Sequence, residues 1–544
     1  MDNKNFSAED DRKLISQYEM RYSDLRALQD NYVPLYNEIA VLGDPRNAYF
    51  RVEKSPGNLS HLTAKTDDTL QANLPLHASV MNSLLTPAAY LWHSMVFSDP
   101  EIQAQFGQQL SVQNMFIYKK RYSSFSNFVC AINTVYMNNA LYGWYVMELS
   151  KDIAHKQVTY RALPIKEFVI DQNERGFVDT FYRKVKFTYR QLRQLFPDYV
   201  PNCAKDQANS DYPYQYLNRT MELLHVVEPS IEHNRKFDSV YIDLTERRII
   251  KKTVEPYCKY IAGRAATFSN TNDPYGFSPV MSVLPSTKNL NAVSFDIVKA
   301  AHHASRFDLL AGDDIVNPKN YPDVTSIING GIDSEGRPQV SVLSQRDLPT
   351  LDYMIQGWQK RIKDALFVDM FASLQETQSR SATDAMLKAN ERANIIAPMG
   401  DRFSRELLQP MIELELQMYS EMKVLPEFPE QAAGAHFDIV LDNPMLRGQR
   451  LDSAQAIMNL GSSYAQIQPF DTEFNLERTS RYLASAYNVP LEVFNTPEEK
   501  QQLIDERQAA AEQQQMIENA NKVGAGIKNL AEAGNIMDNS GGQQ

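Results

Sequence analysis

The amino-acid sequence predicts an α+β protein, mainly α-helical, that is divided into several domains. Its 544 residues exceed what one hydrophobic core serves, and at roughly 100–200 residues per domain they suggest about three or four packed units. Apolar residues recur at helical spacing in the N-terminal and C-terminal parts of the chain. Between about residues 143 and 280, short β-branched and aromatic runs alternate with turn residues, which is typical of antiparallel sheet.

The composition is that of an ordinary folded protein. Hydrophobic residues make up 43% and charged residues 22%, which excludes wholesale disorder and a collagen-like structure. The three cysteines, Cys130, Cys203 and Cys258, are odd in number and far apart, so we expect no disulfide framework and a reducing compartment. No CxxC pair or Cys/His cluster in the sequence indicates structural zinc.

The chain is acidic. Asp and Glu outnumber Lys and Arg by 67 to 55, which gives a formal net charge of −12. Proteins that read DNA sequence bind by neutralising phosphates with clustered Lys and Arg. The charge therefore argues against a sequence-reading DNA clamp, but it is compatible with a protein that lets nucleic acid pass without holding it.

Two long stretches, Leu70 to Ser98 and Tyr122 to Met147, contain no Asp, Glu, Lys or Arg. Both carry polar residues that are costly in hydrocarbon, such as His77 in the first and Asn133 in the second. The polar, acidic N-terminus also lacks the pattern of a signal peptide. We therefore expect two buried helices in a soluble protein that does not enter a membrane.

The N-terminal segment predicts a helix that begins at a capping box formed by Ser7 and Asp10. Apolar and aromatic residues then recur every three or four positions until Pro34 interrupts the pattern. More helices are expected to about residue 142. The stripe of the first helix consists of Leu14, Tyr18, Tyr22, Leu25, Leu28 and Tyr32.

The middle of the chain predicts an antiparallel sheet within an α+β unit that runs to about residue 280. A turn cluster, 171–176, separates two of its strand-forming runs, and a helix is expected near Tyr189–Phe196. The runs are Tyr145–Met147, Phe168–Ile170, Phe177–Val178, Leu223–Val227 and Val240–Ile242.

A helix–β–helix hairpin is expected next. Helices around Leu290–Leu310 and Leu351–Phe371 flank a segment rich in Pro and Gly, with strand candidates at Val324–Ile328 and Val340–Leu343. Each helix has a single apolar stripe, so we expect the stripes to pack against each other and against neighbouring copies. The stripes are Val293, Ile297, Ala300, Ala304 and Phe307, and then Leu351, Ile355, Trp358, Ile362, Leu366 and Met370.

The last part of the chain predicts mainly helix. A long helix starts near Ser381, and Pro398 and Pro410 should kink or break it because each removes a backbone donor. Residues 446–521 form a further helical region, followed by a frayed, glycine-containing tail. The apolar positions of the long helix are Met386, Ala389, Ala393, Ile396, Phe403, Leu407, Met411, Leu414 and Met418.

Enzyme motifs are largely missing from the sequence. It has no GxxxxGK[ST] phosphate loop, HExxH or GxSxG. The triplet Gly312-Asp313-Asp314 could bring two carboxylates to polymerase metals, but it follows a predicted helix instead of linking two strands. A helix end in a solvated turn is the favoured interpretation.

Two other groups have alternative interpretations. His302 and His303 could bind a metal, although adjacent residues face different sides of a helix, which favours one packed and one exposed histidine. Lys360, Arg361 and Lys363 form a basic cluster. It is either a solvated or salt-bridged face or a contact with DNA or with acidic neighbouring subunits.

Four local patterns occur in a fixed order around the hairpin. They are Leu163–Asp171 with Gly176–Asp179, Arg183 and Thr188–Leu192; Tyr275–Pro279 with Leu290-Asn291; Ala382–Ala385 leading to Leu407–Pro410; and Leu446–Gln449. Taken in this order, the four patterns resemble successive sequence segments of one protein family. From Ser124 to Asn521 the chain is similar to the head-to-tail connector, or portal protein, of short-tailed bacteriophages.

The resemblance implies the phage portal fold and a ring of typically twelve subunits. The implied parts are a wing at 1–284, stem helices at 285–312 and 351–372, a clip at 313–350, a channel loop at 373–382, a long kinked helix returning through the wing at 383–445, a crown and helical C-terminal region at 446–522, and a flexible tail at 523–544.

The implied function is structural and non-enzymatic, without cofactor or metal. The ring would sit at one capsid vertex of the virion after assembly in the host cytoplasm, nucleate capsid assembly and conduct double-stranded DNA during packaging and ejection. Its partners would be the terminase large subunit, the tail adaptor and tail tube proteins, and the major capsid and scaffolding proteins. ATP hydrolysis would belong to the terminase, consistent with the missing phosphate loop.

The resemblance also assigns candidate residues. Arg380 is the only cation of the implied channel loop, and it would touch phosphates or pair with Glu376 or Asp384 of a neighbouring copy. The loop candidates are Gln375, Glu376, Thr377, Gln378, Ser379, Arg380 and Ser381. The clip candidates for tail docking are Asn329, Gly330, Gly331, Glu335, Gly336 and Arg337.

Two alternative functions belong to other classes. A metal-dependent nucleic-acid enzyme would use Asp313 and Asp314. The other is a different capsid-associated or internal virion protein, which deletion of residues 313–350 would distinguish from a portal.

Overall fold

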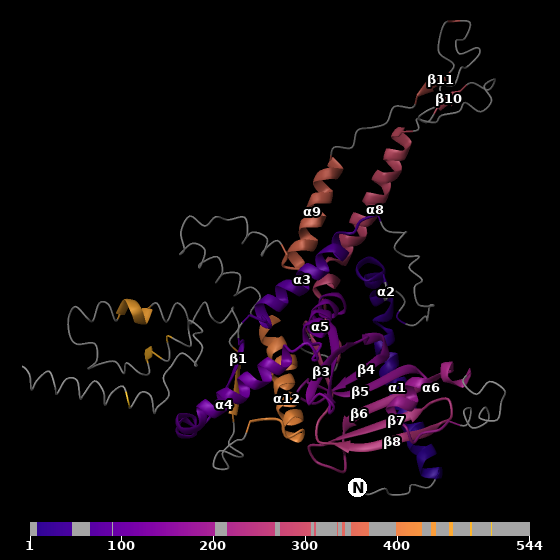
Figure 1. Cartoon of the computed structure of the whole chain (residues 1–544). Helices are drawn as coiled ribbons and strands as arrows, with labels where there is room; N and C mark the ends of the chain where they lie inside the picture. Colours follow the sequence, from indigo (N-terminus) through magenta and orange to yellow (C-terminus); the bar gives the residue numbers. More distant parts are fainter. Residues whose placement is uncertain are drawn as a thin grey trace, which may run out of the picture. The chain divides into compact units, whose positions relative to one another are not determined.

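The computed structural model describes residues 8–45, 66–89, 91–201, 215–266, 273–305, 350–368 and 399–426, with short pieces at 309–311, 340–342, 437–441 and 456–460 and a few single positions. The chain divides into two compact units, Met1–Gly448 and Gln449–Gln544. Nearly all described residues belong to the first unit, which mixes helices and sheets (Figure 1). The predicted α+β class is confirmed.

Helices dominate the N-terminal part, as predicted. The break near Pro34 is confirmed, because a turn follows the first helix and Pro34 lies in the first turn of the second. Ser7 of the predicted capping box lies outside the described residues. The helices are α1 (Ala8–Asp30), α2 (Val33–Gly43), α3 (Thr69–Leu85), α4 (Pro100–Arg121) and α5 (Phe128–Tyr142).

The prediction of one buried helix over Leu70 to Ser98 is wrong in its second half. Helix α3 ends at Leu85, and β1 (His93–Phe97) pairs antiparallel with β12 (Phe437–Leu441). The partner strand lies more than three hundred residues further along the chain, so nothing local to β1 announces the pairing. Among the described residues, no helix is long and apolar enough to cross a membrane.

The predicted change from helix to sheet near residue 143 is confirmed. Helix α5 ends at Gly143, whose φ of +80° suits a residue without a Cβ. A Cβ on Gly143 would lie 2.4 Å from the carbonyl oxygen of Gly276, and one on Gly276 would lie 2.2 Å from that of Gly143. The two glycines therefore let the segment before α8 pass directly over the end of α5.

A five-stranded antiparallel meander follows in the order β4-β5-β6-β7-β8. The predicted helix near Tyr189–Phe196 is α6 (Tyr189–Leu195), which starts at a capping box of Thr188 and Gln191. Edge strand β8 was not predicted, because its charged residues obscure the alternation. The strands are β4 (Phe168–Gln172), β5 (Val178–Thr188), β6 (Thr220–Pro229), β7 (Phe237–Asp243) and β8 (Arg248–Glu255).

A three-stranded antiparallel sheet, in the order β3-β2-β9, lies beside α5. Its central strand β2 (Trp144–Asp152) contains the predicted run at Tyr145, whereas β3 (Gln157–Leu163) and β9 (Tyr260–Arg264) were not predicted. The buried side chains of β2 join the clusters on both sides of the sheet. This strand therefore lies at the centre of the first unit.

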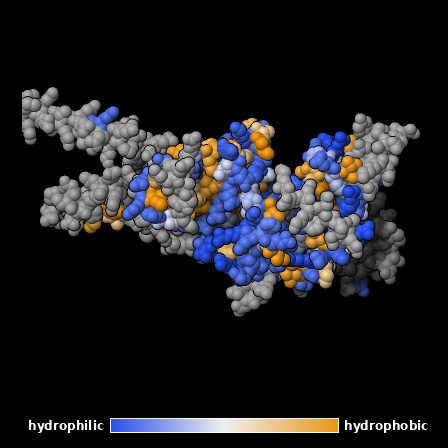
Figure 2. Space-filling view, turned by 90° about the horizontal axis from the view of Figure 1, so that it is seen from below, coloured by the Kyte–Doolittle hydropathy of each residue, from blue (hydrophilic) through white to orange (hydrophobic). Residues whose placement is uncertain are grey.

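Helix α1 covers one face of the five-stranded sheet. Tyr18 of the predicted stripe and its neighbour Ile15, which was not predicted, are buried against the sheet, and Leu14, Tyr22 and Leu25 pack there partly buried. Leu28 is exposed, so the stripe is confirmed as a packing face only in part. Figure 2 looks at the molecule from below, the side on which β8 lies in Figure 1. Its coloured residues are mostly hydrophilic, with small separate hydrophobic groups.

The helical stripe from Phe403 to Met418 is confirmed, because all five predicted positions are buried. Pro410 does not break the helix. Instead, residues Ser404–Leu408 form a π-helical turn that runs into α12 (Gln409–Glu421), with the N–H of Gln409 donating to the carbonyl of Ser404. A wider turn accommodates the proline, which has no N–H and whose ring crowds the preceding turn. Pro398 lies outside the described residues.

Candidate functional site

Helices α8 (Pro279–Ser305) and α9 (Thr350–Ala365) run side by side (Figure 1). Between them in the sequence, β10 (Leu309–Ala311) pairs antiparallel with β11 (Val340–Val342). The predicted helix–β–helix order and the strand at Val340 are confirmed, while Val324–Ile328 lies outside the described residues.

The predicted bounds of the first hairpin helix are wrong at both ends. Helix α8 begins at Pro279, ahead of the predicted Leu290, and it contains Pro285 within its length. At the other end, Leu309 and Leu310 belong to a strand, since they pair with Val342 and Ser341.

The base of the hairpin is anchored in the core. Leu284 and Leu290 of α8 and Ile362 and Leu366 near the end of α9 are buried in one cluster with Trp144. This burial fixes both helices to the sheet-bearing part of the unit. The hairpin is therefore joined to the core at its base.

His77 of α3 holds the end of α9. Its Nδ1 lies 2.8 Å from the carbonyl oxygen of Leu366, and its ring stacks on Phe367. Burial lowers the pKa of His77, so the neutral ring donates through Nδ1 to the carbonyl. The contact fixes the chain just before residues 369–398, which include the predicted channel loop.

Away from the base, the hairpin exposes apolar side chains. The exposed fraction is 46% for Phe295, 45% for Val298, 82% for Tyr353 and 45% for Met354. Exposed apolar groups on two adjacent helices form a typical protein-binding surface. Along the predicted α9 stripe, burial decreases from the C-terminal end of the helix toward Ile355.

The basic cluster lies on α9 close to the base. Lys360 and Arg361 are exposed and Lys363 is half-buried, while Ile362 between them is fully buried. None of the three cations forms an ion pair with a residue that the structure describes. In the single chain the cluster therefore faces solvent, and both interpretations remain predictions.

Most of the other predicted site residues lie outside the described residues. This holds for the whole channel loop from Gln375 to Ser381 and for the triplet Gly312-Asp313-Asp314. Of the clip candidates only Glu335 is described, and it is exposed. Within the described part of the chain, no group of three or more His, Cys, Asp or Glu side chains could hold a metal ion.

A buried contact group around Arg264 of β9 was not predicted from the sequence. Its backbone N–H donates to Glu406 Oε2 over 2.7 Å, and its Nη2 donates to Glu406 Oε1 over 3.0 Å. The same guanidinium donates to Gln172 Oε1 over 2.9 Å and to the carbonyl of Gly176. Arg264 therefore ties the β4–β5 turn to the π-helical turn that leads into α12.

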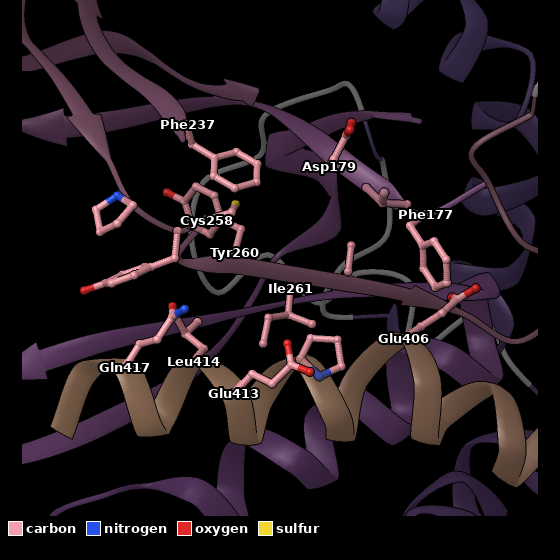
Figure 3. A pocket seen from close by; sticks show the side chains of 15 residues that line it. Phe177, Asp179, Phe237, Cys258, Tyr260, Ile261, Glu406, Glu413, Leu414 and Gln417 are labelled. Carbon is pink, nitrogen blue, oxygen red and sulfur yellow. The ribbon is translucent and has the colours of Figure 1, made fainter. Parts of the chain in front are cut away.

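A cavity of about 390 Å³ lies next to this contact group. One wall is a single face of the π-helical turn and α12, from Glu406 to Gln417, and the opposite wall includes Tyr260 and Ile261 of β9 (Figure 3). Its lining combines aromatic rings with the carboxyl groups of Asp179, Glu406 and Glu413. The cavity can therefore receive a group that is both cationic and partly apolar.

The comparisons with known proteins decide the family. Residues 16–494 match the family model described as bacteriophage head to tail connecting protein. The chain belongs to this family. The expected resemblance to phage connector proteins is thereby confirmed.

Two relatives match over almost their whole length. A probable portal protein of Bordetella phage BPP-1 is 23% identical over 97% of this chain and 96% of the relative. A portal protein of Salmonella phage epsilon15 is 21% identical over 96% of this chain and 95% of the relative. The agreement therefore extends beyond the hairpin, and it includes the first hundred residues.

Proposed function

We propose that this connecting protein is the portal of its phage. About twelve copies form a ring at one vertex of the capsid, and double-stranded DNA passes through the ring during packaging and ejection. In this proposal α8 and α9 are the stem, 313–350 is the clip, 373–382 is the channel loop, and the sheet-bearing part is the wing. The match to the connector family over residues 16–494 is the observation that carries the proposal.

The hairpin supports a ring. Its base is buried in the core, whereas Phe295, Val298, Tyr353 and Met354 are exposed. In a closed ring, one side of each hairpin meets the other side of the next copy, so the exposed apolar groups become buried. A single hairpin pair gains little from this burial, but a ring repeats the gain at every contact.

The charge supports passage of DNA without tight binding. Each copy contributes a formal net charge of −12. Duplex DNA carries one phosphate per roughly 1.7 Å of its axis, so an acidic wall repels the duplex and keeps sliding friction low. The channel loop, rich in Gln, Ser and Thr from Gln375 to Ser381, would offer brief hydrogen bonds, with Arg380 as its only cation.

The proposed portal role predicts which part of the chain contacts each partner. The clip, with Asn329 to Gly331 and Glu335 to Arg337, would dock the terminase large subunit during packaging and then the tail adaptor and tail tube proteins. The major capsid and scaffolding proteins would contact the wing during assembly. The family description favours this structural role over a metal-dependent nucleic-acid enzyme that uses Asp313 and Asp314.

Deletion of residues 313–350 tests the proposal against that of another internal virion protein. The deletion should leave a ring, because the stem helices and their buried bases remain, but the ring should no longer bind the tail. Ring formation is measured by negative-stain imaging, and tail attachment is measured by counting tailed particles. If capsids that contain the deletion variant still attach tails at the normal frequency, the proposed docking role is contradicted.

A further inference from the structure

The acidic cavity has walls that fit a basic side chain. Phe177, Phe237, Tyr257 and Tyr260 contribute aromatic rings, and no Lys, Arg or His is among the described residues that line it. Aromatic faces and carboxylates both attract a guanidinium or ammonium group, and the alkyl stem of Arg or Lys packs on apolar walls. The cavity is open to solvent beside Phe177, whose exposed fraction is 44%.

Asp179 is a cavity carboxylate that forms no ion pair with a described residue, although Arg21 lies near enough to act on its charge. It is half-buried at the start of β5, and it accepts a hydrogen bond from the hydroxyl of Thr180. Burial, together with nearby Asp171, raises the pKa of Asp179. By contrast, Glu406 already pairs with Arg264. Asp179, unlike Glu406, is therefore able to pair with a cation that enters the cavity.

The complementary surface lies on α9 of the same chain. Lys360 and Arg361 are exposed and Lys363 is half-buried, and the described residues offer these cations no ion pair. Ile362 of α9 and Leu366 just after it are buried in the same core cluster as Tyr260 and Ala262, which also line the cavity. The basic cluster and the acidic cavity are therefore two different surfaces around one core.

We propose that, in the assembled ring, the acidic cavity of one copy receives the basic cluster of α9 from a second copy. This inference rests on the proposed ring. Because cavity and cluster are different surfaces of one chain, their contact is head-to-tail, the type of contact that closes a ring. The opposite charges would also set the register between copies and disfavour other pairings.

A photo-crosslink locates the occupant of the cavity. The purified full-length protein carries p-benzoylphenylalanine in place of Phe177 and is assembled from a mixture of ¹⁴N- and ¹⁵N-labelled copies. After irradiation, mass spectrometry should find a crosslink between differently labelled copies that contains the α9 peptide around Lys360 to Lys363. Rings whose crosslinks stay within one copy, reach a different segment, or fail to form would overturn the inference.

Charge-reversal variants test how much the contact between the acidic cavity and the basic cluster contributes to ring formation. Asp179→Lys and Arg361→Glu should each lower the yield of rings by about tenfold or more, and the double variant should recover most of that loss. Glu174→Lys is the matched control, since Glu174 lies in the nearby β4–β5 turn with its side chain 86% exposed and should not change the yield. If Asp179→Lys does not fold, Asp179→Asn replaces it and should still lower the yield.

The outcomes separate the two proposals. Failure of the unmodified chain to form rings contradicts the proposed function. Rings that form equally well with Asp179→Lys or Asp179→Asn contradict this inference alone and leave the portal function standing.

Discussion

Arg121 and Glu415 form a bidentate ion pair that is completely buried. Arg121 Nε lies 3.0 Å from Glu415 Oε1, and Arg121 Nη2 lies 2.5 Å from Glu415 Oε2, with both side chains 0% exposed. His93 of β1 and the hydroxyl of Tyr160 in β3 complete the group. The pair therefore joins the end of α4 to α12 inside the largest core cluster.

Replacing Glu415 should strongly destabilise the fold. Glu415→Gln leaves the guanidinium of Arg121 buried without its counter-charge, and we expect a loss of about 3–5 kcal/mol in the free energy of unfolding. Urea denaturation followed by circular dichroism measures the change. Glu421→Gln is the matched control on α12, because Glu421 pairs with Lys151 at the surface and should cost at most about 1 kcal/mol. Equal losses in both variants would contradict this account of the buried pair.

Stability should fall as the pH drops below about 6.5. His93 and His225 are fully buried, and burial first, then nearby cations (Arg121 for His93, Lys259 and Arg183 for His225), lowers their pKa values well below the usual value. The unfolded chain therefore binds more protons than the folded chain below pH 6.5, which favours unfolding. At pH 5.5 each such histidine should lower the free energy of unfolding by on the order of 1 kcal/mol.

Urea midpoints measured between pH 7.5 and 5.5 check this pH dependence. The exposed His233 provides the control, since His233→Gln should leave the decrease of the urea midpoint with falling pH unchanged. His225→Gln should make that decrease smaller. A midpoint that does not change over this range would show that the buried histidines do not set the pH dependence.

Arg264 should not tolerate lysine. Lysine cannot reproduce the array of guanidinium N–H donors that binds Glu406, Gln172 and the carbonyl of Gly176. Arg264→Lys should cost roughly 2–3 kcal/mol, and hydrogen exchange should rise in both the β4–β5 turn and residues 399–421. Arg161→Lys should change neither region, because Arg161 is exposed and its partner Glu148 also pairs with Lys259. Unchanged exchange in Arg264→Lys would mean that the three segments are not coupled through this side chain.

Removing an exposed apolar group from the hairpin should affect assembly and not folding. Val298→Ser removes a side chain that is 45% exposed on α8, so the thermal midpoint of the monomer should barely move, whereas the yield of rings should fall about tenfold. Ile231→Ser, at a position that is 98% exposed between β6 and β7, should change neither quantity. A normal yield with Val298→Ser would place the contact between copies elsewhere.

Local signals in the sequence were sufficient for much of the fold. The end of α5 at Gly143 and the buried stripe through Phe403 and Met418 follow from patterns within a few residues. Pairings between distant segments were not visible. Strand β1 depends on a partner near residue 437, and Arg121 pairs with Glu415 294 positions away. The acidic cavity likewise needs β5, β9 and α12 together, so no contiguous motif indicates it.

The number of copies in the native particle tests the central claim most directly. Native mass spectrometry of the purified full-length chain, at micromolar concentration and under assembly conditions, should give one dominant species of about twelve copies, which negative-stain imaging shows as a ring with a central channel. A chain that remains monomeric under all of these conditions would contradict the portal assignment.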